Sequence, residues 1–428
     1  MSALGGHRGA RRRDCKDYAL GTRLPDDVET PATLADLAAL LRACDESGRA
    51  AVLFGGRTLQ GLGAVPKRYD LAIDCTRLDR VVEHEPRDLT IALEAGCRVA
   101  ALDAALAACG QFVPLDAPRA AAATIGGTLA SGWLGPRRAT YGRARDFVIG
   151  TTVALADGTI AKAGGMVVKN VTGYDLSKLY VGSLGTLAAI GQANFKTLPL
   201  PAARRLAVAP LPEGTRVRTI ANLAALAIEP AAALIVAGFA KEIDAPNGAD
   251  GSLVVLLEGS ERTVDAATRE LRSALGAAGV PQTRLIDREA GSAFARVLDA
   301  YIETLGSRSM TYRSLGLPSD TTPRLDAFAR VARANRLTLE TIEDVRTGDV
   351  IARLSARLVA DFATRAKAFD GERRTALAGA RILVAPEKLR AGLDVWGAPP
   401  ASLPLMRTLK TRFDPNGTLA PGRYVGGI

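Results

Sequence analysis

The chain has 428 residues, enough for two or three domains, and its hydrophobic content of 48% is typical of a globular protein. It contains no run of about 18 apolar residues, which excludes a predicted membrane span. The formal charge of +10 comes with only 5% aromatic residues and no basic stripe with interleaved aromatics. We therefore expect no nucleic acid, and instead an acidic cofactor, substrate or partner protein.

Cysteine and histidine are too few and too scattered for a metal centre. The five cysteines form no CxxC pair, and only two histidines accompany them. We expect no bound metal and free thiols in a reducing cytoplasm. Residues 1–23 are rich in arginine but lack the apolar core of a secretory signal, so we predict a disordered basic tail on a cytoplasmic protein.

The first predicted elements lead to a glycine-rich loop. Apolar residues at helical spacing predict a helix between Thr33, a suitable N-cap, and Gly48. An apolar strand over residues 50–54 then runs into residues 55–63, G-G-R-T-L-Q-G-L-G. This loop lacks both the G-x-G-x-x-G spacing and the G-K-[ST] ending of known nucleotide loops. By itself it fits a diphosphate-binding loop or a plain surface turn.

Short elements of mixed type surround a second glycine-rich stretch. They are strands over residues 71–74, 80–85 and 89–93, a helix over 99–109, a hairpin of strands 148–154 and 159–163, a loop and helix over 169–181, and a last apolar strand ending at Ile190.

The second glycine-rich stretch, residues 124–135, has the strongest binding signal. Glycine lacks Cβ and adopts positive φ, so backbone amides there are free to approach a bound group and to form an anion-binding nest. Arginines that follow add forked donors for phosphate or carboxylate. Together they predict a large anionic cofactor. The residues are Gly126, Gly127, Ser131, Gly132, Gly135, Arg137, Arg138, Arg143 and Arg145.

The second half of the chain predicts an α+β layer packed over the first unit. Its last element is a basic amphipathic helix over residues 404–413. The other predicted elements are strands 206–209, 233–239 and 253–258, helices 262–276 and 325–335, and a strand or helix edge at 351–358.

Several motifs occur in an order that resembles a known family. They are the loop 55–63, T-I-G-G-T-L-A-S-G, P-R-R-A-T-Y-G, R-D-F-V-I-G, K-N-V-T-G-Y-D-L and G-S-L-G-T-L. The chain resembles the FAD-binding domain of the vanillyl-alcohol-oxidase (PCMH-type) flavoproteins. More narrowly, K-N-V-T-G-Y-D-L-S-K-L-Y-V-G-S-L-G-T-L, D-V-W-G-A-P-P and F-D-P-N-G-T-L-A-P-G-R-Y resemble the FAD-binding E subunits of bacterial glycolate oxidase.

This resemblance implies an α+β fold in which a PCMH-type FAD-binding domain of two α/β subdomains joins an α+β cap. The domains implied are the FAD-binding domain over residues 24–203, the cap over 204–390 and a C-terminal segment, 391–428, that returns to the FAD domain. By position, Gly55, Gly56, Arg57, Thr58, Gly61 and Gly63 would hold the diphosphate. The remaining implied contacts are Thr124, Gly126, Gly127, Ser131 and Gly132 at the diphosphate and flavin, Tyr141, Gly142, Asp146 and Val148 at the adenosine, and Gly185 and Ile190 closing the pocket.

The resemblance also bears on how the cofactor is attached and whether the chain is catalytic alone. Covalent members of the family often use a histidine in the first loop, where this chain has Arg57 and Thr58, so FAD is expected to be noncovalent. Similar 2-hydroxy-acid dehydrogenases carry metal-ligand histidines in the cap, which this cap lacks. They also have a charged residue where this chain has Val168 and Leu184. The polar candidates that remain near the flavin are Lys169, Asn170, Tyr174, Lys178, Arg137 and Arg423.

Three functions are therefore left open. In the first case, the chain is an FAD-binding subunit of a multi-subunit glycolate (2-hydroxy acid) dehydrogenase, with a sister flavoprotein as catalytic subunit and an iron–sulfur partner that receives electrons. Alternatively, it is a self-sufficient FAD oxidase or dehydrogenase of an alcohol or 2-hydroxy acid, with a catalytic base that the sequence does not identify. In the third case it is a flavin-loaded scaffold. A complex of this kind would be cytoplasmic or held at the inner membrane by its partners.

Overall fold

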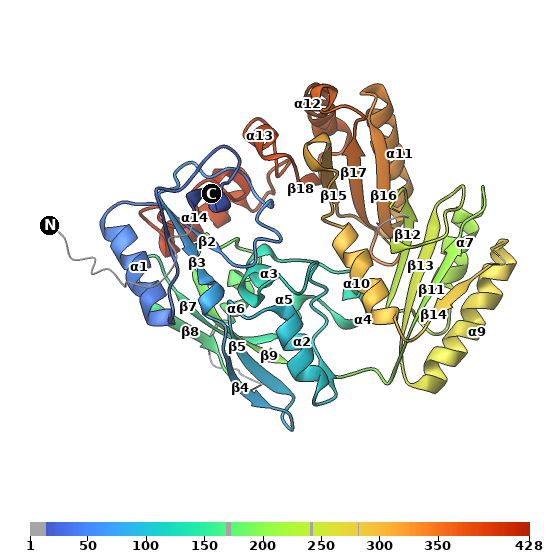
Figure 1. The fold of residues 1–428 in the computed structure, drawn as a ribbon, viewed down its shortest axis with the longest axis horizontal. Coiled ribbons are helices and arrows are strands. Elements are labelled where there is room, and N and C mark those ends of the chain that lie inside the picture. The colour runs from blue at the N-terminus through green and yellow to red at the C-terminus, as the bar shows by residue number, and fades with distance from the viewer. Residues whose placement is uncertain (1–13, 168–172, 240–242, 281) are drawn as a thin grey trace.

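The computed structural model describes residues 14–167, 173–239, 243–280 and 282–428 (Figure 1). The chain folds into two regions, and the first contains a parallel sheet of order β1-β3-β2 and an antiparallel sheet of order β4-β5-β9-β7-β8. Its elements are β1 (Asp27–Glu29), α1 (Leu34–Glu46), β2 (Ala51–Phe54), β3 (Leu71–Asp74), β4 (Val81–Glu85), β5 (Thr90–Glu94), α2 (Val99–Ala107), β6 (Gln111–Phe112), α3 (Ile125–Ser131), α4 (Arg138–Tyr141), α5 (Ala144–Phe147), β7 (Val148–Ala154), β8 (Ile160–Gly164), α6 (Ser177–Tyr180), β9 (Ala189–Lys196) and β10 (Leu198–Pro199).

Helix α1 joins the two sheets of the first region. Thr33 caps it by accepting from the Asp36 amide, and the Asp36 carboxylate accepts from the Thr33 amide in return. The buried face of the helix includes Leu37 and Leu41, which share one core with Ile73 of β3 and Ala189 of β9. The helical spacing of these leucines therefore fixes how the parallel sheet sits against the antiparallel one.

The second region is built on one antiparallel sheet of order β14-β11-β13-β12-β16-β17-β15-β18. Its elements are β11 (Ala203–Pro210), α7 (Arg216–Ala224), β12 (Ala232–Ala237), β13 (Ser252–Gly259), α9 (Glu261–Ala278), β14 (Arg284–Ile286), α10 (Ala290–Ala300), β15 (Ser309–Ser314), α11 (Thr321–Ala334), β16 (Thr338–Asp344), β17 (Asp349–Ser355), α12 (Val359–Ala376), β18 (Ala380–Val384) and α13 (Glu387–Arg390).

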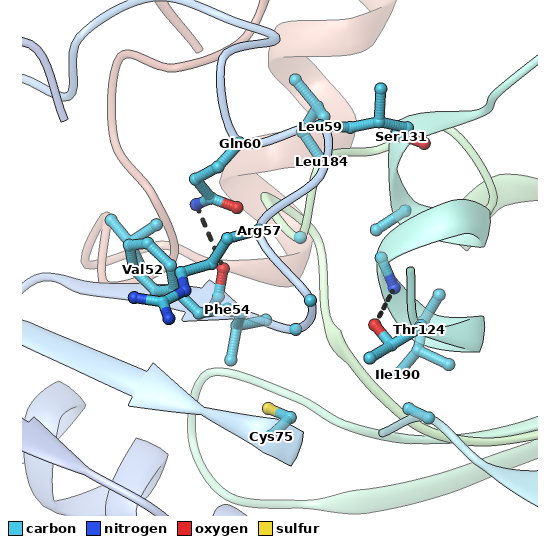
Figure 2. A pocket seen from close by; sticks show the side chains of 18 of the residues that line it. Val52, Phe54, Arg57, Leu59, Gln60, Cys75, Thr124, Ser131, Leu184 and Ile190 are labelled. Atoms are coloured by element: carbon cyan, nitrogen blue, oxygen red, sulfur yellow. Dashed lines mark hydrogen bonds between the residues drawn. The ribbon is translucent and has the colours of Figure 1, made fainter. Parts of the chain in front are cut away.

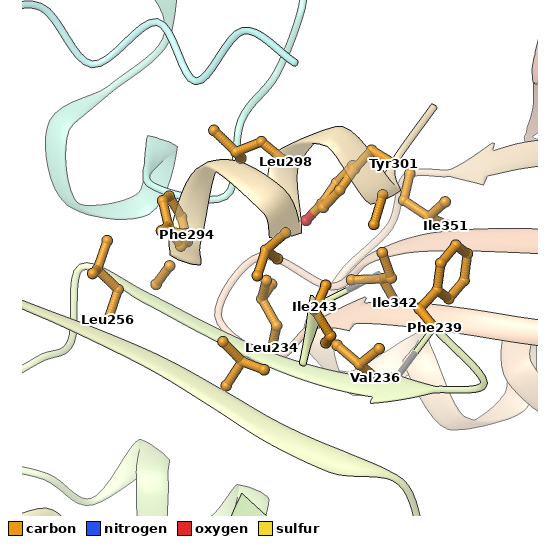
Figure 3. Close-up of a cluster of buried hydrophobic side chains, with 14 of the residues drawn as sticks. Leu234, Val236, Phe239, Ile243, Leu256, Phe294, Leu298, Tyr301, Ile342 and Ile351 are labelled. Carbon is orange, nitrogen blue, oxygen red and sulfur yellow. The ribbon is translucent and has the colours of Figure 1, made fainter. Parts of the chain in front are cut away.

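Both faces of this sheet are covered, because alternate strand residues point to opposite sides. Odd-numbered residues of β13, such as Val255, pack under α7 and α9, and α11 and α12 cover the neighbouring strands on the same side. Even-numbered residues such as Leu256 lie in a second core with Phe294 of α10 and Tyr301, which directly follows that helix (Figure 3). That core also contains Leu62 and Trp133, so α10 lies where the second region meets the first.

The C-terminal segment, which includes helix α14 (Leu403–Phe413), returns to the first region. Leu419 pairs with Ala51 of β2 in a parallel bridge, and Lys410 Nζ donates to the Thr186 carbonyl at 2.8 Å. No helix in the described ranges is long and apolar enough to cross a membrane.

Several local expectations are corrected by the structure. Residues 14–23 are packed instead of disordered, since Tyr18 is buried and donates to Asp74. The apolar strand placed before Ile190 is wrong, because β9 begins at Ala189 and runs to Lys196. The expected nest at Gly126 and Gly127 is the first turn of α3. Helices α7, α10 and α12 lie where no helix was predicted.

Candidate functional site

A cavity that opens to solvent lies between the two sheets of the first region (Figure 2). Its walls come from the end of β2 and the loop that follows, from α3, and from the segment that enters β9. The lining residues are Val52, Leu53, Phe54, Gly55, Gly56, Arg57, Thr58, Leu59, Gln60, Cys75, Ala95, Thr124, Gly126, Gly127, Ala130, Ser131, Leu184, Gly185, Ala188, Ile190 and Arg423.

Two glycines let the loop after β2 approach the segment before α3. A Cβ on Gly55 would lie 2.1 Å from Thr124 Oγ1, and one on Gly56 would lie 1.7 Å from the Ala122 carbonyl oxygen. No side chain tolerates such distances, so only glycine permits this contact. The side chain of Arg57 points away from Thr124 (Figure 2). Its Nη1 donates to the Asp17 carbonyl at 2.8 Å.

Helix α3 supplies the facing wall. Thr124 caps it, with Oγ1 accepting from the Gly127 amide at 3.2 Å. A Cβ on Gly127 would lie 3.1 Å from this Oγ1 and would meet no other neighbouring atom within 4 Å. The open side of Gly127 therefore faces the cavity that it lines. The peptide backbone is thus exposed to a ligand along the first turn of the helix.

The charged lining is cationic. Among the described lining residues, Arg57 and Arg423 are the charged ones, and no aspartate, glutamate, histidine, lysine or tyrosine joins them. Burial, and next the charge of Asp74, raises the pKa of the Cys75 thiol to about 12, so this lining sulfur stays protonated at neutral pH. The cavity therefore suits an elongated anionic ligand with apolar ring surfaces, and it offers no side chain to accept a proton.

The structure gathers part of the expected site and leaves part outside. Eleven expected residues line the cavity: Gly55, Gly56, Arg57, Thr58, Thr124, Gly126, Gly127, Ser131, Gly185, Ile190 and Arg423. Gly61 lines a neighbouring hollow, and Asp146 and Val148 line a third one together with Tyr174 and Lys178. Gly63, Gly132, Arg137, Tyr141 and Gly142 line none of these three. Val168, Lys169 and Asn170 lie outside the described residues.

Arg137 and Tyr141 take part in a buried cluster between the two regions. Arg137 Nε lies 2.6 Å from Asp116 Oδ1, and its Nη1 lies 3.2 Å from Glu258 Oε1 on β13. Tyr141 donates to Glu258 Oε2 at 3.0 Å. The guanidinium of Arg137, which we expected to contact the cofactor or the substrate, therefore binds two buried carboxylates of the protein.

A second cluster lies next to it. Arg138 Nη1 lies 3.4 Å from Asp349 Oδ2 and 3.6 Å from Asp344 Oδ2, and Arg313 also pairs with Asp349. Burial raises the pKa of Asp344 to about 6, although hydrogen bonds from Thr347 and the charge of Arg138 act to lower it. Since the folded pKa exceeds the unfolded value of about 3.9, protonated Asp344 stabilises the fold at low pH, and this stabilisation is lost as pH rises through 6.

Replacing Asp344 with asparagine should remove that pH dependence. Between pH 4 and pH 7, the free energy of unfolding of the wild-type protein should fall by up to about 3 kcal/mol relative to that of Asp344→Asn. Urea unfolding of both proteins across this range measures the difference. A difference that stays constant with pH would contradict the assignment.

Sequence reasoning missed the apolar floor of the cavity. Val52, Cys75, Ala95 and Ala188 come from different elements and form no local motif. Only the pairing of β2 with β3, and of β5 with β9, brings them together. Among the described residues, no group of three or more histidine, cysteine, aspartate or glutamate side chains is placed to bind a metal ion.

Comparison with known proteins identifies the family. Residues 25–175 match the model of the FAD binding domain. The glycolate oxidase subunit GlcE of Escherichia coli is 30% identical over 376 residues, which cover 87% of this chain and 91% of that protein. The chain belongs to the GlcE family. It is therefore an FAD-dependent oxidoreductase, as predicted, and its cofactor is FAD.

Other comparisons place this GlcE-family chain among wider relatives. Glycolate oxidase subunit GlcD of Bacillus subtilis is 31% identical over 252 residues, 56% of this chain and 53% of that protein. The crystal structure of p-cresol methylhydroxylase superposes with a TM-score of 0.75 at 17% identity, over 94% of this chain and 89% of that one. This likeness concerns the fold alone and confirms the predicted PCMH-type fold class. The domain boundaries at 203 and 390 stay a prediction.

Proposed function

We propose that this chain is the FAD-binding subunit of a multi-subunit glycolate, or similar 2-hydroxy acid, dehydrogenase, and that it relays electrons to an iron–sulfur partner. The observation that supports this most is the cavity itself, which fits a flavin dinucleotide but provides no general base among its described lining residues. Oxidation of a hydroxy acid requires such a base for the hydroxyl proton. We assign substrate oxidation to a sister flavoprotein.

The lining residues fit FAD in shape and chemistry. We propose that Gly55, Gly56, Thr58 and the first turn of α3 hold the diphosphate through backbone amides, which the absence of side chains at these glycines leaves accessible. The apolar floor would cover a ring system. Bound FAD supplies the flavin N5 as a two-electron acceptor. The chain's own residues bind it, orient it and exclude water from the floor.

The attachment is proposed to be noncovalent. Among the described lining residues no histidine or tyrosine is present, and the Cys75 thiol is held protonated by burial. His84, the histidine in the described ranges, lies on β4 outside the cavity. Denaturation of the purified protein should therefore release all of its FAD.

Electron transfer beyond the flavin needs a partner in this proposal. The five cysteines are free thiols, and the described residues contain no group of three or more cysteine, histidine or acidic side chains that could hold an iron–sulfur cluster. The names of the two relatives, both subunits of glycolate oxidase, support an assembly with a sister subunit.

Visible absorption of the purified chain tests the proposal. We expect a flavin spectrum that stays oxidised when glycolate or D-lactate is added anaerobically, and that bleaches once the sister subunit is also present. Bleaching by substrate alone would contradict the relay and indicate a self-sufficient dehydrogenase. A bound flavin that never changes during turnover of the assembled complex would indicate a scaffold, and a chain without flavin would overturn the assignment.

A further inference from the structure

Buried arginines in the described part of the chain fall into two kinds. Five are almost fully buried, and three of these face a carboxylate within ion-pair distance: Arg313 with Asp349, Arg353 with Glu340, and Arg373 with Asp370. Arg390 and Arg423 are 4% and 3% exposed. No carboxylate in the described part of the chain lies within ion-pair distance of either, although the charge of Glu387 acts on Arg390 from farther away. Burying an uncompensated charge is costly, so these two positions require an explanation.

The two guanidinium groups are attached to the same turn. Arg423 Nη2 donates to the carbonyls of Gln60 at 3.1 Å and Leu62 at 2.8 Å, and Arg390 Nη2 donates to the carbonyl of Gly63. Arg390 ends α13, whereas Arg423 belongs to the C-terminal segment. Chain segments far apart in sequence therefore place two positive charges side by side, against the last residues of the glycine-rich loop.

Each arginine retains donor capacity. Arg423 Nη1 and Arg390 Nε are buried and have no hydrogen-bond partner. Burial, and next the charge of Arg390, lowers the pKa of Arg423 to about 9, and burial lowers that of Arg390 to about 10. Both remain protonated at neutral pH, so two charged donors stay unsatisfied by the protein alone.

The position of the pair points to a ligand. Arg423 lines the cofactor cavity, and Arg390 lines the adjoining hollow, which shares Phe54, Arg57, Thr58, Leu59 and Gln60 with the cavity. We infer that Arg423 and Arg390 form an oxyanion subsite at the end of the cofactor cavity, completed by a negatively charged group of the bound ligand. Planar guanidinium groups match phosphate and carboxylate oxygens through paired hydrogen bonds.

This inference rests on the proposed function for the identity of the ligand. The oxyanion has two sources there, the diphosphate of FAD and the carboxylate of a 2-hydroxy acid that reaches the adjoining hollow. Pyrophosphate and ADP contain a diphosphate but no carboxylate, and glycolate contains a carboxylate but no phosphate. Separate binding measurements with these probes therefore distinguish the two sources.

Binding calorimetry on the full-length chain, freed of flavin, tests the subsite with pyrophosphate, ADP, FAD and glycolate as separate probes. Arg423→Gln and Arg390→Gln should each weaken binding about ten- to a hundredfold, for the phosphate probes if the diphosphate occupies the site and for glycolate if the carboxylate does. Arg423→Lys, which keeps the charge, should recover part of the affinity. Arg412→Gln, an exposed position on α14, is the matched control and should bind as wild type.

Stability of the unliganded variants separates the subsite from a structural role. Removing an uncompensated charge should leave the unfolding temperature of the flavin-free chain unchanged or higher. Wild-type affinity for all four probes in both glutamine variants would overturn the subsite and leave the proposed function standing. A wild-type chain that binds pyrophosphate but not FAD would overturn the proposed function and support the subsite.

Discussion

Replacing Gly127 with valine is expected to give a folded but colourless protein. Gly127 lies in the first turn of α3, and a Cβ there points into the cavity, 3.1 Å from Thr124 Oγ1. The valine methyl groups would occupy the space of the cofactor and crowd the threonine that caps the helix. Overpacking of this kind should lower FAD affinity about a hundredfold, measured by flavin absorbance per chain and by titration of the flavin-free protein.

The fold itself should survive, because valine is no worse than glycine inside a helix. Gly276 in α9 provides a matched control, since a Cβ at this helical position meets no atom within 4 Å. Gly276→Val should retain its flavin. A yellow Gly127→Val protein with wild-type FAD affinity would show that the dinucleotide does not pass this turn of α3.

Replacing Arg137 with methionine is expected to destabilise the fold by about 3–5 kcal/mol, because it removes the cationic partner of buried Asp116 and one of the two cationic partners of buried Glu258. Asp116 would keep the Arg137 backbone amide as donor, and Glu258 would keep Arg204 at 2.6 Å and the Tyr141 hydroxyl. Since Glu258 belongs to β13 and Arg137 to the segment before α4, the loss should loosen the contact between the two regions. Urea unfolding followed by circular dichroism measures the change.

A surface ion pair offers the comparison. Arg205 pairs with Asp265 and Asp287, whose side chains are more than half exposed, so Arg205→Met should cost about 1 kcal/mol or less. At temperatures where Arg137→Met is folded, it should still bind FAD with wild-type affinity. An intact stability combined with lost FAD affinity would reverse the assignment and make Arg137 a cofactor ligand.

The role of Arg137 illustrates what local sequence does not resolve. Its neighbourhood of glycines and arginines predicts an anion site, and a guanidinium binds a phosphate or a carboxylate equally well. Asp116 and Glu258, which occupy it, lie 21 and 121 residues away along the chain. Arg423 shows the opposite case, because it donates to backbone carbonyls and has no carboxylate partner among the described residues. This becomes visible only once the C-terminal segment is seen against the loop after β2.

Local chemistry alone determined the strand and loop that begin the cavity and the helix after Thr33, because residue spacing and capping act over a few residues. The motif order also determined the family and its cofactor. Tertiary structure decided which side chains meet: the apolar floor, the two clusters that neutralise Arg137 and Arg138, and the unpaired Arg390 and Arg423. Burial and ion pairing depend on distances between segments that only strand pairing and domain contact set.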